Sequence, residues 1–211
     1  MPTIASGSTI TAATMTLKFT NGTDTAANAS AYKVTGGDWA SDTITWSNMP
    51  ATATALATNI SHNNLTGYTF SCKTAVQSWY SGSTTGQNAN FGIMLRYYSE
   101  SIADYNAVYS ADYTDESKRP ALMITYQPAT SSVSVVEGST YTLTPPNVNG
   151  TITWKSNNVT VATVSSTGKV TGVKAGVTTI SASVGGAVQK YYTVYVKISN
   201  GVYYIKSNAS N

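Results

Sequence analysis

Two side chains predicted to face outward are the strongest candidates for binding chemistry in this sequence. Residues 93–98 alternate in a way that is typical of a strand with one buried face. If Ile93 and Leu95 face inward, Arg96 and Tyr98 face outward and set a guanidinium beside an aromatic ring. Sugar rings stack on such rings while their hydroxyls meet arginine, and the arginine could also pair with the carboxylate of an acidic polysaccharide.

Further tyrosines extend this candidate platform beyond the strand. Tyr105, Tyr109 and Tyr113 recur at every fourth residue in a polar loop or edge region, where packing alone would not explain solvent-facing rings. We therefore predict a ligand-binding set made of Arg96, Tyr98, Tyr105, Tyr109 and Tyr113. A purely structural role for the tyrosines stays open, because tyrosine is abundant throughout the chain.

Catalytic chemistry has few candidates among the titratable residues. His62 is the only histidine and lies in a polar run typical of a loop, so we expect a surface side chain rather than a base or a metal ligand. No Gly-x-Ser-x-Gly motif supplies a nucleophile. The acidic residues of the first half gather only modestly: Asp38, Asp42, Asp104, Asp112, Asp115 and Glu116. Carboxylates could hydrolyse glycosides or bind calcium, but turn roles are favoured, and we predict no enzyme activity, metal or cofactor.

Cys72 is the only cysteine, which excludes an internal disulfide and a cysteine-based zinc site. On a strand it would face the same side as Phe70, so we expect a buried small side chain rather than a reactive thiol. No run of about 18 apolar residues occurs, and the first residues do not form a signal peptide. We expect no membrane insertion, and an export signal, if any, outside this chain.

The net charge of +3 hides an asymmetry between the two halves of the chain. Residues 1–128 hold six basic against eight acidic residues, or −2, whereas residues 129–211 hold six basic residues against Glu137 alone, or +5. The basic residues of the second half are scattered, without the clusters and interleaved aromatic residues of nucleic-acid grooves. We expect no nucleic-acid partner.

Secondary structure is predicted most clearly from Trp154 to Ala182, where short apolar runs alternate with glycines. The predicted strands lie near 152–154, 161–164, 170–173 and 177–184. Tight turns are expected at the glycines between them: Gly168, Gly172 and Gly176. This spacing predicts an all-β sandwich with Trp154 in its core.

The same residues carry a family resemblance. Trp-x-Ser at 154–156, Val-Ala-Thr-Val at 161–164, Gly-Lys-Val-Thr-Gly-Val at 168–173 and Ala-Gly-x-Thr-Thr-Ile at 175–180 resemble the bacterial immunoglobulin-like group-2 domain. The resemblance covers Ser131–Val196. It implies an immunoglobulin-like sandwich that serves as a spacer or adhesive module in a secreted protein.

The first half also has the pattern of an all-β domain. Alternating residues predict strands at 15–19, 44–46, 93–97 and 122–126, and one helical turn is possible at 74–79. Proline and small polar residues after Tyr126 mark a boundary. Trp39, Trp46 and Trp79 precede it, and Trp46 and Trp79 are expected in the core because their neighbours are apolar.

Landmarks of this first half resemble the DNRLRE-type domain of large extracellular proteins. They are Trp39, Trp46 and Pro50, then Phe70 and the run 76–82, then Asn90-Phe91-Gly92-Ile93, and finally the run 117–126. Related domains act as carbohydrate-binding modules. The motif that names the family is absent, and Ser71 stands where an acidic residue is usual.

Both ends of the chain bear on completeness. Residues 4–17 look like the middle of such a domain, so we expect opening strands to be missing, to be supplied by a partner chain or a neighbouring segment, or simply to lie outside the fragment. Residues 198–208 resemble the first strand of a ricin-type lectin repeat.

We therefore predict an all-β chain with a partial jelly-roll-like sandwich at 1–127, an immunoglobulin-like sandwich at 128–197, and the start of a further module or a tail at 198–211. The predicted function is non-catalytic polysaccharide binding in a secreted or cell-wall-associated bacterial protein, next to other modules of the same protein. The alternative is a structural or adhesive fibre-forming protein completed by strand exchange.

Overall fold

The structure is a computed structural model that describes residues 4–22, 29–36, 39–40, 43–60, 67–81, 90–97 and 106–199. The chain divides into two compact units, which we call the N-terminal unit (Ile10–Tyr126) and the C-terminal unit (Met1–Thr9 with Gln127–Asn211). In this division, residues 4–9 group with the C-terminal unit. The fold class is all-β, as predicted.

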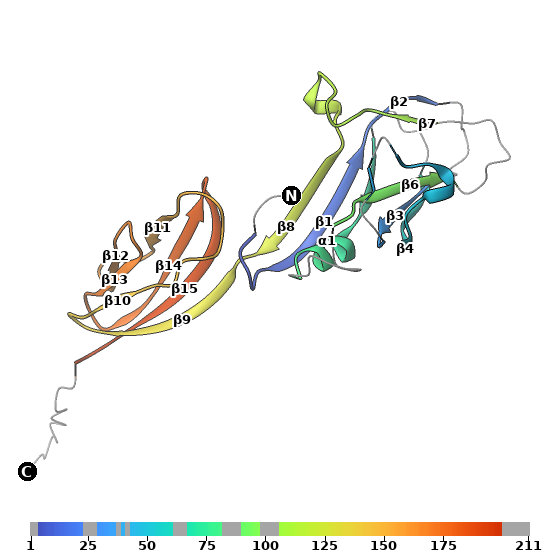
Figure 1. Ribbon diagram of the computed structural model, residues 1–211. Helices are drawn as coiled ribbons and strands as arrows, with labels where there is room; N and C mark the ends of the chain where they lie inside the picture. The colour runs from blue at the N-terminus through green and yellow to red at the C-terminus, as the bar shows by residue number, and fades with distance from the viewer. Residues whose placement is uncertain are drawn as a thin grey trace, which may run out of the picture. The chain divides into compact units, whose positions relative to one another are not determined.

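In its described residues, the N-terminal unit holds three small sheets and short helices (Figure 1). Its strands are β1 (Thr9–Leu17), β2 (Phe19–Gly22), β3 (Ala29–Val34), β4 (Thr52–Ile60), β5 (Tyr68–Ser71), β6 (Ile93–Tyr97), β7 (Asn106–Val108) and β8 (Ala121–Gln127). They pair in the orders β5-β1-β8, β4-β3-β6 and β2-β7. Its helices are α1 (Lys73–Trp79) and the 3-10 turns Trp46–Asn48 and Glu116–Lys118.

The core of the N-terminal unit is built from small and β-branched side chains. Its buried apolar residues are Ile10, Ala13, Leu17, Phe19, Ala29, Ala31, Val34, Ile60, Phe70, Cys72, Ala75 and Val76. Cys72 is fully buried where β5 runs into α1, and its backbone amide donates to the carbonyl of Ala13 at 2.9 Å. Cys72 is therefore a buried small side chain, as predicted, and burial raises the pKa of its thiol.

The strand predicted at Ile44 and Trp46 is wrong. Ile44 is exposed, and residues 46–48 form a 3-10 turn. The side chain of Asn48 accepts from the backbone amide of Thr45 at 2.5 Å and donates to the carbonyl of Thr43 at 2.9 Å. These local hydrogen bonds occupy backbone groups that would otherwise pair with a neighbouring strand. For this reason the alternation of apolar residues alone did not predict the turn.

The C-terminal unit is a two-sheet sandwich (Figure 1). Its strands are β9 (Ala129–Val136), β10 (Thr140–Thr142), β11 (Thr153–Ser156), β12 (Ala162–Val164), β13 (Lys169–Gly172), β14 (Gly176–Val184) and β15 (Ala187–Lys197). One sheet has the order β11-β14-β15-β9, with β15 and β9 parallel, and the other has the order β10-β13-β12. In the part of the chain that the structure describes, no helix is long and apolar enough to cross a membrane.

The tryptophan that was predicted to lie in the core of this sandwich is only partly buried. Trp154 packs against a buried cluster, and its ring centroid is 5.6 Å from that of Tyr192. Gly168, at φ +78°, makes the predicted turn beneath the indole. Gly172 does not fit the turn prediction, because it ends strand β13, where an added Cβ would lie 2.9 Å from the carbonyl oxygen of Val136. Because glycine has no side chain, the backbone at Gly172 can lie close to the backbone at Val136.

Candidate functional site

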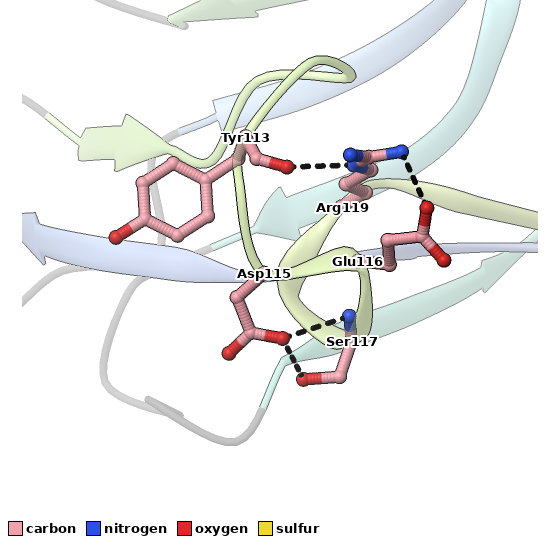
Figure 2. A network of polar contacts seen from close by, with 5 residues as sticks. All are labelled: Tyr113, Asp115, Glu116, Ser117 and Arg119. Carbon is pink, nitrogen blue, oxygen red and sulfur yellow. Dashed lines mark hydrogen bonds and ion pairs between the residues drawn. The ribbon is translucent and has the colours of Figure 1, made fainter.

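A cluster of aromatic and charged side chains lies in residues 109–119, between β7 and β8, which we call loop 109–119. Asp115 shapes its end by capping the 3-10 turn. The Oδ1 atom of Asp115 accepts from the amide of Ser117 at 3.0 Å and from its hydroxyl at 2.7 Å (Figure 2). An aspartate in this position satisfies amide groups that the turn leaves open, so the loop has a defined shape.

Arg119 ties the two arms of the loop together (Figure 2). Its Nε donates to the carbonyl oxygen of Tyr113 at 2.7 Å, and its guanidinium pairs with Glu116 at 3.2 Å. The Glu116 side chain is 82% exposed, so the ion pair alone stabilises the loop little. The hydrogen bond to the Tyr113 backbone is the more specific restraint, because it fixes the chain at the tyrosine itself.

Tyr109 and Tyr113 form an aromatic pair on this scaffold. Their ring centroids are 4.6 Å apart with the planes tilted by 54°. The amide of Tyr109 donates to the carbonyl of Lys18 at 3.0 Å, which anchors the loop to the chain between β1 and β2. Tyr113 is 37% exposed, and Tyr109 is half-buried. The pair therefore offers a ring to solvent that is supported from behind by a second ring.

Lys118 adds a positive charge to the pair. Its Nζ lies 5.4 Å from the ring centroid of Tyr109 and 5.9 Å from that of Tyr113. The neighbouring Tyr109, then Asp115 and Tyr113, raise the pKa of Lys118, so the side chain stays an ammonium at neutral pH. A cation within about 6 Å of a ring is attracted to its face, and an ammonium also donates to ligand oxygens.

The described acidic residues of the loop act in its local structure. A hydrogen bond from the Ser110 side chain lowers the pKa of Asp112, and hydrogen bonds from Ser117 lower the pKa of Asp115. Both carboxyls are therefore ionised acceptors at neutral pH, without the raised pKa that a general acid needs. Within the described ranges, no group of three or more histidine, cysteine, aspartate or glutamate side chains could hold a metal ion. His62, Asp38, Asp42 and Asp104 lie outside the described residues.

The structure brings together only part of the predicted ligand-binding set. Tyr109 and Tyr113 are in contact within loop 109–119. Arg96 is exposed on β6, opposite Ser30 of β3, and thus belongs to the sheet β4-β3-β6 and not to the loop. Tyr98 and Tyr105 lie outside the described residues.

The prediction that Leu95 faces inward is wrong, because its side chain is 41% exposed. In the described sheet order, β6 pairs on one side only, with β3. Side chains of a strand point to the two faces of its sheet and are buried only where another layer packs on that face, so alternation alone does not mark burial.

Sequence reasoning missed Lys118 and Arg119 as partners of the tyrosines. A cue was present, since a Lys-Arg pair follows Tyr113 within six residues. The predicted ligand-binding set also left out Trp39, which is 47% exposed and donates its indole Nε1 to the carbonyl of Phe91 at 2.7 Å. Because its polar group is already paired, the exposed part of this ring is apolar surface suited to stacking.

The N-terminal unit is thus all-β and carries the aromatic pair of Tyr109 and Tyr113, with Lys118 beside it. Residues 1–126 match the model of carbohydrate-binding module family 96, and residues 123–194 match that of the bacterial Ig-like domain (group 2). The first match covers more than half of the chain, and the chain belongs to carbohydrate-binding module family 96. A comparison with curated proteins found no match.

These matches confirm the immunoglobulin-like resemblance and the carbohydrate-binding class of the first half. The DNRLRE-type name itself is not among the matched families. Both matched families are non-catalytic domain types that typically occur in extracellular proteins.

Proposed function

We propose that the N-terminal unit binds a polysaccharide through loop 109–119, with Tyr113 as the stacking ring. The observation that carries the proposal is the 4.6 Å ring pair of Tyr109 and Tyr113 with the ammonium of Lys118 beside both rings. A sugar ring has an apolar face and a rim of hydroxyls. The tyrosine ring meets the face, and the ammonium donates to hydroxyl or carboxylate oxygens at the rim.

Arg96, Tyr98 and Tyr105 complete the proposed binding surface. Arg96 is exposed, as a ligand contact requires, and its fork of donors suits vicinal hydroxyls or a carboxylate. Tyr98 follows β6 directly in the chain, and Tyr105 immediately precedes β7. Polysaccharides extend over several sugar residues, so contacts on more than one strand are consistent with one ligand.

The wider assignment follows from the domain types. We place the protein outside the cell, secreted or cell-wall associated, as a non-catalytic part of a larger bacterial protein of the DNRLRE-like kind. The sandwich at 1–127 binds the glycan, and the immunoglobulin-like domain at 128–197 acts as a spacer. Residues 198–211 are proposed as the start of a further module or as a tail. Other modules of the same protein are the expected neighbours, and no nucleic acid or membrane partner is proposed.

Affinity electrophoresis tests the function. The chain is run through native gels that contain neutral or acidic polysaccharides, and retention by at least one of them is expected. Tyr113→Ala should lose most of that retention, whereas Tyr141→Ala should not, because Tyr141 is a comparably exposed tyrosine, 44%, in the C-terminal unit. Unretarded migration in every gel, or equal retention of both variants, would contradict the proposal.

The alternative, strand exchange between chains, rests on the free side of β8. In the described sheet order β5-β1-β8, this strand lies at an edge, and its residues alternate between exposed and half-buried, with Met123 69% exposed. An edge strand with uncovered apolar side chains can pair with a strand of another chain. Light scattering after size exclusion decides: polymers favour this fibre-forming role, and monomers at all concentrations argue against it.

A further inference from the structure

A pocket of about 520 Å³ lies in the N-terminal unit, and none of its described lining residues belongs to loop 109–119. It is lined by residues of β3, β4, β5 and α1, and its polar lining side chains are Lys33, Thr54, Ser71, Thr74 and Ser78. The volume is in the range of sites for small molecules. Apolar residues of β4 and Ala75 of α1 supply the remainder of the wall.

Lys33 is the unusual member of this pocket. Its side chain is only 8% exposed, although lysine rarely lies that deep in a protein. Its Nζ donates to the Oγ of Ser78 at 2.6 Å, and the Ser78 hydroxyl in turn donates to the carbonyl of Ala75 at 2.7 Å. Helix α1 therefore presents the Ser78 oxygen to the amine and holds the amine in place.

Burial lowers the pKa of Lys33, which shows that the folded protein bears a cost for its charge. A costly polar group beside an open cavity is a feature of ligand sites, where the ligand replaces the lost water. Thr54, Ser71 and Thr74 are exposed residues of the lining, whereas Lys33 is a buried one. The described lining contains no aromatic ring, and recognition here would use hydrogen bonds rather than stacking.

We propose that this pocket, called the Lys33 pocket, binds a single sugar residue at the end of a glycan chain. The ring and hydroxyl oxygens of a sugar accept from the amine, and its hydroxyls exchange hydrogen bonds with the threonine and serine hydroxyls. The inference rests on the proposed function and adds a second site to it. Loop 109–119 would contact the length of a chain, and the Lys33 pocket would hold its terminus.

NMR of the full chain tests the pocket, with methyl glycosides of neutral and acidic monosaccharides as probes. At least one glycoside is expected to shift the amide signals of Lys33 and Ser78 in a saturable way. Lys33→Met keeps the length of the side chain, removes a buried charge, and should weaken this binding roughly tenfold. Ser78→Ala retains the amine of Lys33 and should also weaken glycoside binding. This second variant tests the pocket if Lys33→Met fails to fold. Lys155→Met in the C-terminal unit is the matched control and should bind as wild type.

The two proposals fail separately. If polysaccharide retention depends on Tyr113 but no glycoside shifts the signals of Lys33 and Ser78, the pocket is wrong and the loop site stands. Shifts confined to Tyr109 and Tyr113 also overturn the pocket. Glycoside binding at Lys33 without any polysaccharide retention supports the pocket and overturns the loop site. If no polysaccharide retains the protein and no glycoside shifts the signals of Lys33 and Ser78, both proposals are wrong.

Discussion

Arg119 restrains the backbone of Tyr113: the Nε atom of Arg119 donates a hydrogen bond to the Tyr113 carbonyl oxygen at 2.7 Å. This hydrogen bond fixes the position of the residue while the aromatic ring stays against Tyr109 and partly open to solvent. A ring that is held before the ligand arrives loses less conformational freedom on binding. Arg119 is thus a positioning residue for the proposed platform.

Replacing Arg119 by methionine should weaken polysaccharide binding several-fold while the protein stays folded. The substitution removes the restraint on Tyr113, and the expected loss of stability is only about 1 kcal/mol, because the arginine contacts lie at the surface. Affinity electrophoresis reports the binding, and thermal unfolding reports the stability. Glu116→Gln is the control, since it removes the ion pair but leaves the donor to Tyr113 in place. A loss of binding in Glu116→Gln as large as in Arg119→Met would contradict the positioning role.

Trp39 should contribute a second stacking surface. Its ring is 47% exposed, and its Nε1 is occupied by the Phe91 carbonyl, so Trp39→Ala is expected to lower affinity for the retained polysaccharide by roughly tenfold. Trp39→Phe keeps a ring but loses the hydrogen bond and should show an intermediate affinity. Titration of that polysaccharide should change the tryptophan fluorescence of wild type and not that of Trp39→Phe. A full fluorescence response in Trp39→Phe would rule out this contact.

The sequence predicted the ring pair only in part. Spacing of four residues indicated that Tyr109 and Tyr113 belong together, but the segment is an ordered loop and not a helix, so the spacing itself does not bring the rings into contact. The contact depends on the turn capped by Asp115 and on Arg119, and such side-chain to backbone bonds are not visible in hydrophobic patterns. Lys33 was missed for a different reason, since a lysine within a strand is ordinarily expected at the surface.

The C-terminal unit was more predictable than the N-terminal one. Its strands β11 to β14 fall close to the predicted ranges, because each of these four strands has one face on a shared apolar core that includes Ile180 and Val194. The N-terminal unit has three small sheets, one of which leaves Leu95 exposed on an edge strand. Alternation marks burial only where a second layer covers the strand, and that condition is a property of the tertiary fold.

Gly168→Ala should destabilise the C-terminal unit by at least about 2 kcal/mol. A Cβ at Gly168 would lie 2.7 Å from Cζ2 of Trp154, and the residue has φ +78°. Gly138 has the same φ of +78° with nothing within 4 Å of its Cβ position. Gly138→Ala therefore carries the backbone strain without the clash, and the difference between the two variants measures the packing against Trp154. Urea unfolding followed by fluorescence gives both values, and equal losses in the two variants would show that the contact with the indole is unimportant.

Tyr192 should make the C-terminal unit sensitive to alkaline pH. Its side chain is 2% exposed, its hydroxyl donates to the Thr144 carbonyl at 2.5 Å, and burial raises its pKa to about 12. An unfolded tyrosine titrates near about pH 10, so the folded state holds this proton more tightly. The resulting stabilisation is complete below about pH 10, is lost as pH rises through about 12, and is on the order of 2 kcal/mol.

The decisive comparison is between two phenylalanine variants on β15. Tyr192→Phe should be less stable than wild type at neutral pH by about 1–3 kcal/mol, because the Thr144 carbonyl loses its partner, and its free energy of unfolding should fall less between about pH 9 and 12. Tyr195 is 43% exposed on the same strand, so Tyr195→Phe should keep the stability and the alkaline loss of wild type. Urea titrations at a series of pH values measure both variants. A Tyr192→Phe protein that loses as much stability in alkali as wild type would mean that another group causes the alkaline loss.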